Sequence, residues 1–434
     1  MILKKYGYLI ACVISVIFAF VRCASFDFST CKTPSGRGYI YKATWNKSDD
    51  YLLITSDGEK VLLTIFGNCD EINKEKAECA TLAHLECKIN NVNENDYGRY
   101  LLSKGVRYSA YCNWDKIRFI EKKDNLNITR FFATLRYNIK SNLIEVIGAE
   151  YGGIAFAVMT GSDVIMDEDV KENFSDAGIL HVLAVSGMHV AMIMKPVALI
   201  SRNRFMGYKA RGVFKILAAV LFMFLTDFSH SVVRAVLMFI YAQCGKVFDR
   251  TTLMSNGIYF AGIIQLLHNP FTIYSVGFLL SYAAVLSISY IEPLIPINRK
   301  HLSSVKTGIA VNIGLIPLLM YLFGKISLIG IAVNSVAGFL SGAICISGFC
   351  CGFIYNTQLI GFIGRLSGYL CAFFTMCLSK VASVASKAPP PVGAMNISLD
   401  SIYVVVMIYT CLILAVIALW KKKGKKNNLF EESM

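Results

Sequence analysis

Long apolar segments, separated by short polar loops, make up most of the 434-residue chain. A helix of about 20 apolar residues matches the hydrocarbon thickness of a lipid bilayer. The first apolar run follows Lys4 and Lys5, and residues 1–23 are predicted to form an N-terminal transmembrane helix that is not cleaved. The alternative is a signal peptide that is processed near Cys23.

Nine further apolar runs continue this pattern over residues 161–420. They lie at about 178–200, 212–228, 230–244, 252–268, 274–292, 305–323, 326–354, 358–379 and 401–420. Together with the first segment they predict a membrane all-α polytopic bundle of about ten spanning helices. An even number of spans puts both ends of the chain on one side. Residues 421–434 are predicted to be a basic cytoplasmic tail.

Residues 24–125 have a different pattern, with short β-prone runs between turn residues. Strands are predicted at 51–55, 60–66, 85–89, 108–112 and 116–120, and a helical turn or two at 78–85. Five or six short strands with one small helix favour a small all-β domain of OB-like type, a partly open barrel. A small β-sandwich is the alternative.

Residues 126–160 connect this domain to the later spans. Apolar residues recur at helical spacing over 127–142 with basic residues between them, which predicts an amphipathic helix in the membrane interface. Residues 143–160 are apolar but include Glu145 and Glu150, which are costly in hydrocarbon. This segment is therefore predicted to be interfacial or re-entrant.

Composition and charge support this organisation. Hydrophobic residues are 55% of the chain and charged residues 17%, whereas soluble domains carry about 25% charged residues. The formal net charge is +14, but residues 24–124 contain 15 basic and 15 acidic residues. The excess lies in short loops and at the ends, which favours a signal of orientation over direct attraction to nucleic acid. This distribution of basic residues predicts that both termini are cytoplasmic and that the OB-like domain is extracytoplasmic.

Five of the 14 cysteines fall in the OB-like domain: Cys31, Cys69, Cys79, Cys87 and Cys112. Outside the cytoplasm these thiols are expected to form one or two disulfides, with no pairing predicted. No cysteine spacing resembles a zinc site, and no GxxxxGK[ST] or HExxH run occurs. No metal, cofactor, ATPase activity or catalytic residue is therefore expected.

Polar residues within the predicted membrane region are the candidates for function. On an ideal helix, His181 and His189 lie about 80° apart around the axis and about 12 Å along it, and a break at Ser186–Gly187 would shorten this distance. The alternatives are a polar pathway, hydrogen bonds between packed helices, and a metal site. Arg234 is interpreted as a phosphate or carboxylate contact, or as an ion-pair partner of Asp176 or Asp227.

Two later segments contain further polar and small residues. Asn312 and Pro317 are predicted to interrupt one helix, and Asn334 begins a stretch of small residues in the next. Close helix packing is the alternative interpretation. The full set of pathway-lining or gating candidates is Asp176, His181, Ser186, Gly187, His189, Arg234, Asn312 and Asn334.

Several of these motifs resemble those of one family. Residues 161–190 read GSDVIMDEDVKENFSDAGILHVLAVSGMHV, with the core HVLAVSGMH at 181–189. Later runs are SVVRAVLM at 231–238, GFLLSYAAVLSI at 277–288, IPLLMYLFGKISLIGIAVN at 316–334 and PPPVG at 389–393. In the OB-like domain, NENDYGRYLLSKGV at 93–106 is a weaker match because two residues of the family pattern are replaced. In this order the motifs resemble the ComEC family of competence DNA channels.

The resemblance implies a channel that imports one DNA strand across the bacterial inner membrane during natural transformation. It implies single-stranded DNA, membrane lipids, a periplasmic DNA receptor and a cytoplasmic helicase or ATPase as partners. Many members end in a metallo-β-lactamase-like domain; this chain ends after the basic tail, so no nuclease activity is expected and a separate nuclease would degrade the other strand. The alternatives are a transporter or channel for a small anionic solute, and a scaffold that recruits partners.

Overall fold

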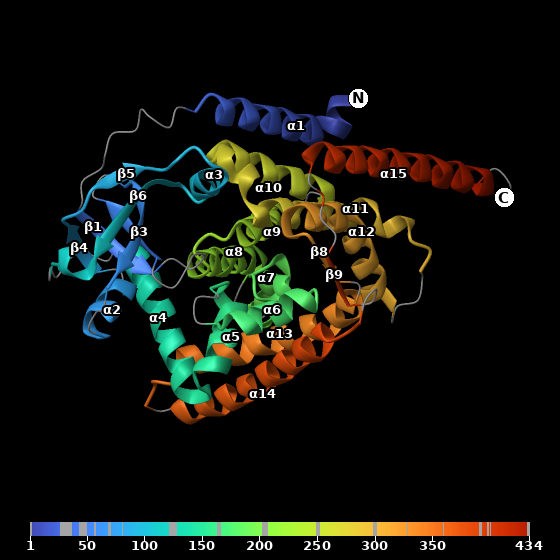
Figure 1. Cartoon of the computed structure of the whole chain (residues 1–434). Coiled ribbons are helices and arrows are strands. Elements are labelled where there is room, and N and C mark those ends of the chain that lie inside the picture. Colours follow the sequence, from blue (N-terminus) through green and yellow to red (C-terminus); the bar gives the residue numbers. More distant parts are fainter. Residues whose placement is uncertain are drawn as a thin grey trace. The chain divides into compact units, whose positions relative to one another are not determined.

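A computed structural model gives the fold of the chain (Figure 1). The chain is mainly helical and has one separate β domain. The structure describes residues 2–26, 37–42, 50–55, 58–67, 71–79, 81–120, 128–162, 166–201, 207–248, 252–297, 302–327, 329–358, 360–389, 393–396, 399 and 401–431. It divides into two compact units. Unit 1 comprises residues 1–167, 181–278 and 340–377, and unit 2 comprises residues 168–180, 279–339 and 378–434.

The β domain of unit 1 is a curled seven-stranded sheet in the order β5-β6-β3-β2-β1-β4-β7. Its strands are β1 (Arg37–Lys42), β2 (Asp50–Thr55), β3 (Lys60–Phe66), β4 (Thr81–Leu85), β5 (Ile89–Asn91), β6 (Val106–Asn113) and β7 (Ile117–Phe119). All neighbours are antiparallel except β3 and β6, which run parallel. Apolar side chains are buried on both faces, in one cluster around Leu63 and Tyr108 and another around Leu52 and Leu101. The sheet is therefore covered on both sides over much of its area.

The strand predictions are confirmed at β2, β3, β6 and β7. The two predictions for residues 78–89 are wrong. A helical turn was expected at 78–85, but the helix α2 (Glu71–Glu78) ends at Glu78 and residues 81–85 form strand β4. A strand was expected at 85–89, but residues 86–88 connect β4 to β5. Tertiary burial decides this segment, because Ala83 and Leu85 alternate into the core as strand residues. The helix α3 (Asp96–Ser103) was not predicted; Asn95 caps its N-terminus by accepting a hydrogen bond from Gly98 N at 2.6 Å.

Two helices follow the β domain, α4 (Ile128–Ile147) and α5 (Ala149–Thr160). An ion pair between Lys140 and Glu78 links α4 to α2. Every residue of α5 from Gly152 to Thr160 is buried within the protein. At the end of α4, Asn142 Nδ2 donates to the carbonyl of Gly352 at 3.0 Å. Both helices are thus packed against other parts of unit 1.

Every predicted span overlaps a helix, although the span predicted at 178–200 is helical only from Gly187. These helices are α1 (Ile2–Ala24), α7 (Gly187–Ile200), α8 (Tyr208–Leu225), α9 (His230–Val247), α10 (Met254–His268), α11 (Val276–Tyr290), α12 (Ser303–Phe323), α13 (Ile329–Ile354), α14 (Gly361–Ser386) and α15 (Ile402–Glu431). By length and hydropathy, five described segments are able to cross a membrane: Val276–Leu294, Val305–Phe323, Ala332–Ile354, Gly361–Ser386 and Ile402–Trp420. Ile10–Ala24 and Gly187–Ile200 are shorter apolar helices.

The β domain is attached to the helices of unit 1 by polar contacts to backbone carbonyls. Asn269 Nδ2 donates to the carbonyls of Leu102 and Ser103 at 2.8 and 3.0 Å. His230 Nε2 lies 3.2 Å from the same Ser103 oxygen. Arg136 Nη1, on α4, donates to the carbonyl of Phe224 at 3.1 Å. His230 and Asn269 therefore contact the C-terminal end of α3.

Unit 2 contains α6 (Glu168–Asp176), α12, α15, and the strands β8 (Lys325–Ser327) and β9 (Ala394–Asn396), which pair antiparallel. Trp420 Nε1 donates to the carbonyl of Tyr290 at 3.0 Å, and Tyr409 OH donates to the carbonyl of Gly314 at 2.7 Å. These bonds hold α15 against α11 and α12. Gly178 has φ +72°, and a side chain there would meet the backbone of Gly330.

Candidate functional site

The centre of the candidate site is the N-terminus of α7. The predicted span at 178–200 is wrong over its first nine residues: they contain only a short 3-10 helix (Leu180–Val182), and α7 begins at Gly187. The helix break hypothesised at Ser186–Gly187 is confirmed. Ser186 is the N-cap with an extended backbone, and its Oγ accepts from Met188 N at 3.3 Å.

His189 completes a capping box with Ser186. Its Nδ1 accepts a hydrogen bond from the backbone N–H of Ser186 at 3.0 Å, a role that usually belongs to Glu or Gln. Because Nδ1 accepts, the neutral ring carries its proton on Nε2. The side chain is 0% exposed, and Nε2 has no hydrogen-bond partner among the described residues. A buried N–H donor therefore lies in the first turn of α7.

Arg234 lies on α9, about one turn from its start, and is 5% exposed. A Cβ on Gly187 would come within 3.1 Å of Arg234 Nη2 and 3.4 Å of Ala235 Cβ. The guanidinium thus lies directly against the first residue of α7, and a side chain at position 187 would have to displace it by a few tenths of an ångström. A cation and the positive end of a helix dipole occupy the same place.

His181 precedes α7 and is exposed within unit 1, and it lies close enough to His189 for their charges to interact. The separation of about 12 Å expected on a straight helix does not apply, because the backbone between them is not helical. Of the eight predicted candidates, His181, Ser186, Gly187, His189 and Arg234 are brought together in unit 1. Among the described residues, no group of three or more His, Cys, Asp or Glu could hold a metal ion.

The other three candidates belong to unit 2. Asp176 Oδ1 accepts from Lys325 Nζ at 3.0 Å, so its ion-pair partner is Lys325. Asn312 Nδ2 donates to the carbonyl of Gly308 in its own helix at 2.9 Å. Pro317 was predicted to interrupt this helix, which is wrong: α12 is continuous to Phe323. Asn334 Oδ1 is buried and has no hydrogen-bond partner among the described residues.

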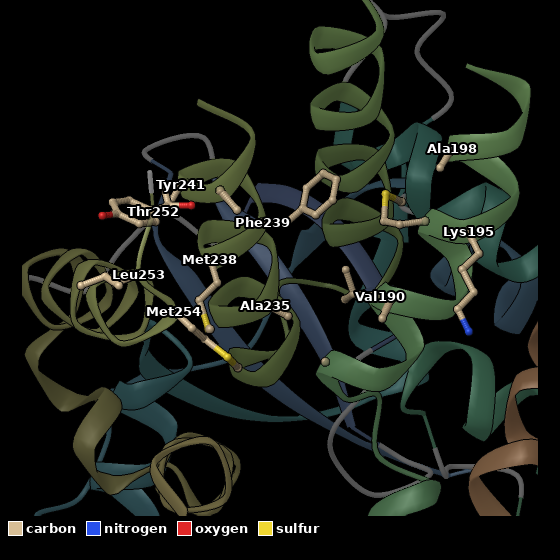
Figure 2. Close-up of a pocket in the computed structure, with 15 residues that line it drawn as sticks. Val190, Lys195, Ala198, Ala235, Met238, Phe239, Tyr241, Thr252, Leu253 and Met254 are labelled. Atoms are coloured by element: carbon tan, nitrogen blue, oxygen red, sulfur yellow. The ribbon is translucent and has the colours of Figure 1, made fainter. Parts of the chain in front are cut away.

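Sequence patterns did not predict an apolar groove that Gly187 helps to line. Figure 2 shows the groove with Val190, Ala235 and Met254 among its lining side chains. Its volume is about 560 Å³, and it is lined by α7, α9 and the start of α10. Among the described residues that line it, Lys195 is the only cation. The signal that could have found it is the spacing of small residues: Ala191 and Ala198 recur after seven positions on α7, as Ala235 and Ala242 do on α9. This spacing keeps them on one helix face.

The cysteines of the β domain are free thiols where the structure describes them, at Cys79, Cys87 and Cys112. Cys31 and Cys69 lie outside the described residues. Disulfide formation therefore stays a prediction.

The apolar helices and the separate β domain define the class: a mainly helical membrane protein with an appended curled sheet. Residues 158–424 match the family model described as "Competence protein". Because this match covers more than half of the chain, the chain belongs to the Competence protein family. The resemblance to the ComEC family is thereby confirmed.

One curated relative is similar to part of the chain. ComE operon protein 3 of Bacillus subtilis (strain 168) is 24% identical over 240 residues, which are 55% of this chain and 30% of the relative. The chain thus matches less than a third of that protein's length. No solved structure gives a significant match.

Proposed function

We propose that this chain is an inner-membrane channel that takes up single-stranded DNA during natural transformation. The observation that carries the proposal is the Competence protein match, which extends over residues 158–424 and includes the α7 N-terminus, Arg234 and the apolar groove. The family supports a role in DNA uptake in competence. The channel role is our inference from the buried polar cluster beside the groove.

A DNA strand needs a polar or wet lining at membrane depth, because phosphates are costly in hydrocarbon. Arg234 lies beside the start of the groove and Lys195 lines its further part, so the cations could contact phosphates at two depths. Ten spanning helices, with both termini cytoplasmic and the β domain outside, would place the α7 N-terminus in the outer half of the membrane.

The β domain would receive the strand before it enters the membrane. On its surface, Phe66 and Tyr111 are 51% and 67% exposed, and their rings stack with centroids 6.1 Å apart and an interplanar angle of 13°. Exposed, stacked aromatic rings on a sheet are suited to stacking with unpaired bases. This platform supports an OB-like function for the domain.

The channel would act with other proteins. A periplasmic DNA receptor would deliver the strand, a cytoplasmic helicase or ATPase would supply energy, and a separate nuclease would degrade the second strand. Conduction breaks no covalent bond, so we propose no enzymatic activity for this chain. Membrane lipids would surround the apolar helix faces.

Transformation of a deletion strain tests the proposal. Deletion is expected to abolish uptake of a marked DNA fragment with normal growth, and the wild-type gene to restore it. His181→Ala is expected to lower transformation at unchanged membrane levels, because it removes a polar group beside the site. Lys209→Ala, on the exposed start of α8, is the matched control and should transform normally. Normal transformation in the deletion strain would contradict the proposal.

The alternative function is a channel or transporter for a small anionic solute. The observation that favours it is the small number of cations in the groove, where Lys195 is alone. It would show saturable solute uptake that DNA does not inhibit.

A further inference from the structure

Hydrogen-bond donors and positive charge are concentrated where α7 begins. The guanidinium of Arg234 lies against Gly187, the first helical residue. His189, two residues later, places a buried Nε2–H donor in the same turn. The N-terminus of α7 adds the positive end of its dipole. Three independent features of unit 1 thus favour an anion at this position.

Physical cost makes the arrangement informative. The Arg234 side chain is 5% exposed and lies against Gly187, at the positive end of α7. A buried N–H donor without an acceptor is destabilising, because its hydration is lost and no hydrogen bond replaces it. An anion placed at the first turn of α7 would accept a hydrogen bond from His189 Nε2 and lie at the positive end of the helix. Backbone N–H groups at helix N-termini bind phosphate in this way.

Access comes from the groove. Gly187 is both the residue against Arg234 and a lining residue of the groove, so the groove reaches the first residue of α7. The missing side chain at Gly187 lets a ligand oxygen approach the helix start. Arg presents a planar fork that matches the paired oxygens of a phosphate.

We propose that the first turn of α7, Arg234 and His189 form a binding site for one backbone phosphate of the DNA strand. This inference rests on the proposed function, since it names the group on DNA that the site holds. The phosphate accepts hydrogen bonds from Arg234 and from His189 Nε2 and lies at the positive end of α7. The site holds the strand between the β domain and the groove.

Salt-dependent binding tests the site. The full-length chain is placed in phosphatidylcholine nanodiscs, which contain no anionic lipid, and binding of fluorescent (dT)20 is measured at several salt concentrations. Arg234→Gln is expected to reduce the slope of log K against log salt by about 0.7, the value for one phosphate contact to a single strand. Arg234→Lys should keep the slope and lower the affinity, since lysine retains the charge without the fork.

His189→Gln separates the donor from the charge. Glutamine at this position keeps the capping acceptor for Ser186 N but does not place a donor where Nε2 lies. The variant is expected to bind (dT)20 about tenfold more weakly with an unchanged salt slope, because a neutral hydrogen bond to a charged group is lost. An oligonucleotide with uncharged methylphosphonate linkages should bind wild type and Arg234→Gln equally.

Lys209→Gln is the matched control, a cation of unit 1 on the exposed start of α8. An equal loss of slope in this control, or an unchanged slope in Arg234→Gln, would overturn the phosphate site. So would an Arg234 effect that arises only when phosphatidylglycerol is added, because the ligand would then be a lipid headgroup. If deletion abolishes transformation while Arg234→Gln keeps the wild-type slope, this inference fails and the proposed function stands.

Discussion

The absence of a Cβ atom at Gly187 allows the Arg234 guanidinium to lie against the start of α7. The Gly187 backbone is ordinary right-handed helix, so the residue is not needed for a special conformation. Space is the constraint: a Cβ would lie 3.1 Å from the Arg234 guanidinium, inside normal contact distance. The same residue faces the groove. Close approach of α7 and α9 at this point keeps the cation beside the helix start.

Cys87 and Cys112 give a prediction at the residue scale. The register of β5 and β6 pairs Ile89 with Ala110 and Asn91 with Tyr108, and its continuation places Cys87 opposite Cys112. Cα atoms of directly opposed residues lie about 4.5–5.5 Å apart, within the range of a disulfide. Cys87 packs against the core cluster that contains Cys112. We expect a Cys87–Cys112 disulfide when the β domain is exposed to an oxidising compartment.

Burial, together with the adjacent Cys87 thiol, raises the pKa of Cys112 to about 12. Little thiolate is present at neutral pH, so oxidation should be slow without a thiol–disulfide oxidoreductase. Mass spectrometry of the chain after alkylation without reduction is expected to find the two cysteines as one cross-linked peptide. Cys79, whose thiol lies elsewhere in the domain, is the control and should be alkylated. Alkylation of Cys87 and Cys112 as free thiols in protein from the oxidising side would contradict the prediction.

At the scale of elements, the attachment of α3 is the feature with the clearest consequence. The last carbonyls of a helix have no partner within it. Here the carbonyls of Leu102 and Ser103 accept from Asn269, and that of Ser103 also from His230. Side chains from the helical part of unit 1 thus cap a helix of the β domain. The two parts of unit 1 are coupled through this cap.

Asn269→Ala is expected to loosen this attachment. Loss of a hydrogen-bond donor to two buried carbonyls should cost about 1–3 kcal/mol of local stability. Hydrogen exchange of residues 96–105 is therefore expected to accelerate, while exchange in β2 and β3 stays as in the wild type. Asn113→Ala, an exposed asparagine of the same domain, is the control. Equal exchange of residues 96–105 in the two variants would show that the cap does not hold α3.

At the scale of the whole molecule, the number of spans decides orientation. Five described segments meet the length and hydropathy required to cross a membrane, and further apolar helices are shorter. Ten spans place both termini on the same side, whereas five place them on opposite sides. The six-residue run 421–426, with five lysines, favours a cytoplasmic C-terminus.

Reporter fusions distinguish the two counts. Green fluorescent protein fused after Met434 is expected to fluoresce, because it folds in the cytoplasm. Alkaline phosphatase fused after Lys123 is expected to be active, since the proposed topology puts the β domain outside the cytoplasm. The exchanged pair, phosphatase at the C-terminus and fluorescent protein after Lys123, is the control and should be inactive. An active C-terminal phosphatase would contradict ten spans.

Sequence reasoning located most elements of the fold because their signals are local. Apolar length placed every predicted span on an observed helix, and alternation found four of the strands. It failed at residues 78–89, where burial of Ala83 and Leu85 in the sheet core overrides the local pattern. It also missed α3, whose short amphipathic stretch becomes helical with a cap at Asn95 and packing against the sheet.

The candidate site was only partly predictable. The polar residues within the predicted spans were visible in the sequence, and so was the helix-breaking Ser186–Gly187 pair. Their grouping was not: Arg234 lies against Gly187, while Asp176 pairs with Lys325 in unit 2. Contacts between residues 47 and 149 positions apart depend on how helices pack, which no local pattern encodes.

The sequence by itself determined that this is a membrane protein with a separate β domain. A segment that faces lipid must be apolar and a segment that faces water must be polar, so each segment shows its surroundings in its own composition. It also determined the family, through motifs that occur in order. The tertiary structure decided where α7 begins, which cation meets its N-terminus and which asparagine caps α3. Those outcomes depend on close packing between segments that are distant in the sequence. The missing Cβ of Gly187 lets Arg234 approach, and the positions of the Leu102 and Ser103 carbonyls allow Asn269 to bind them.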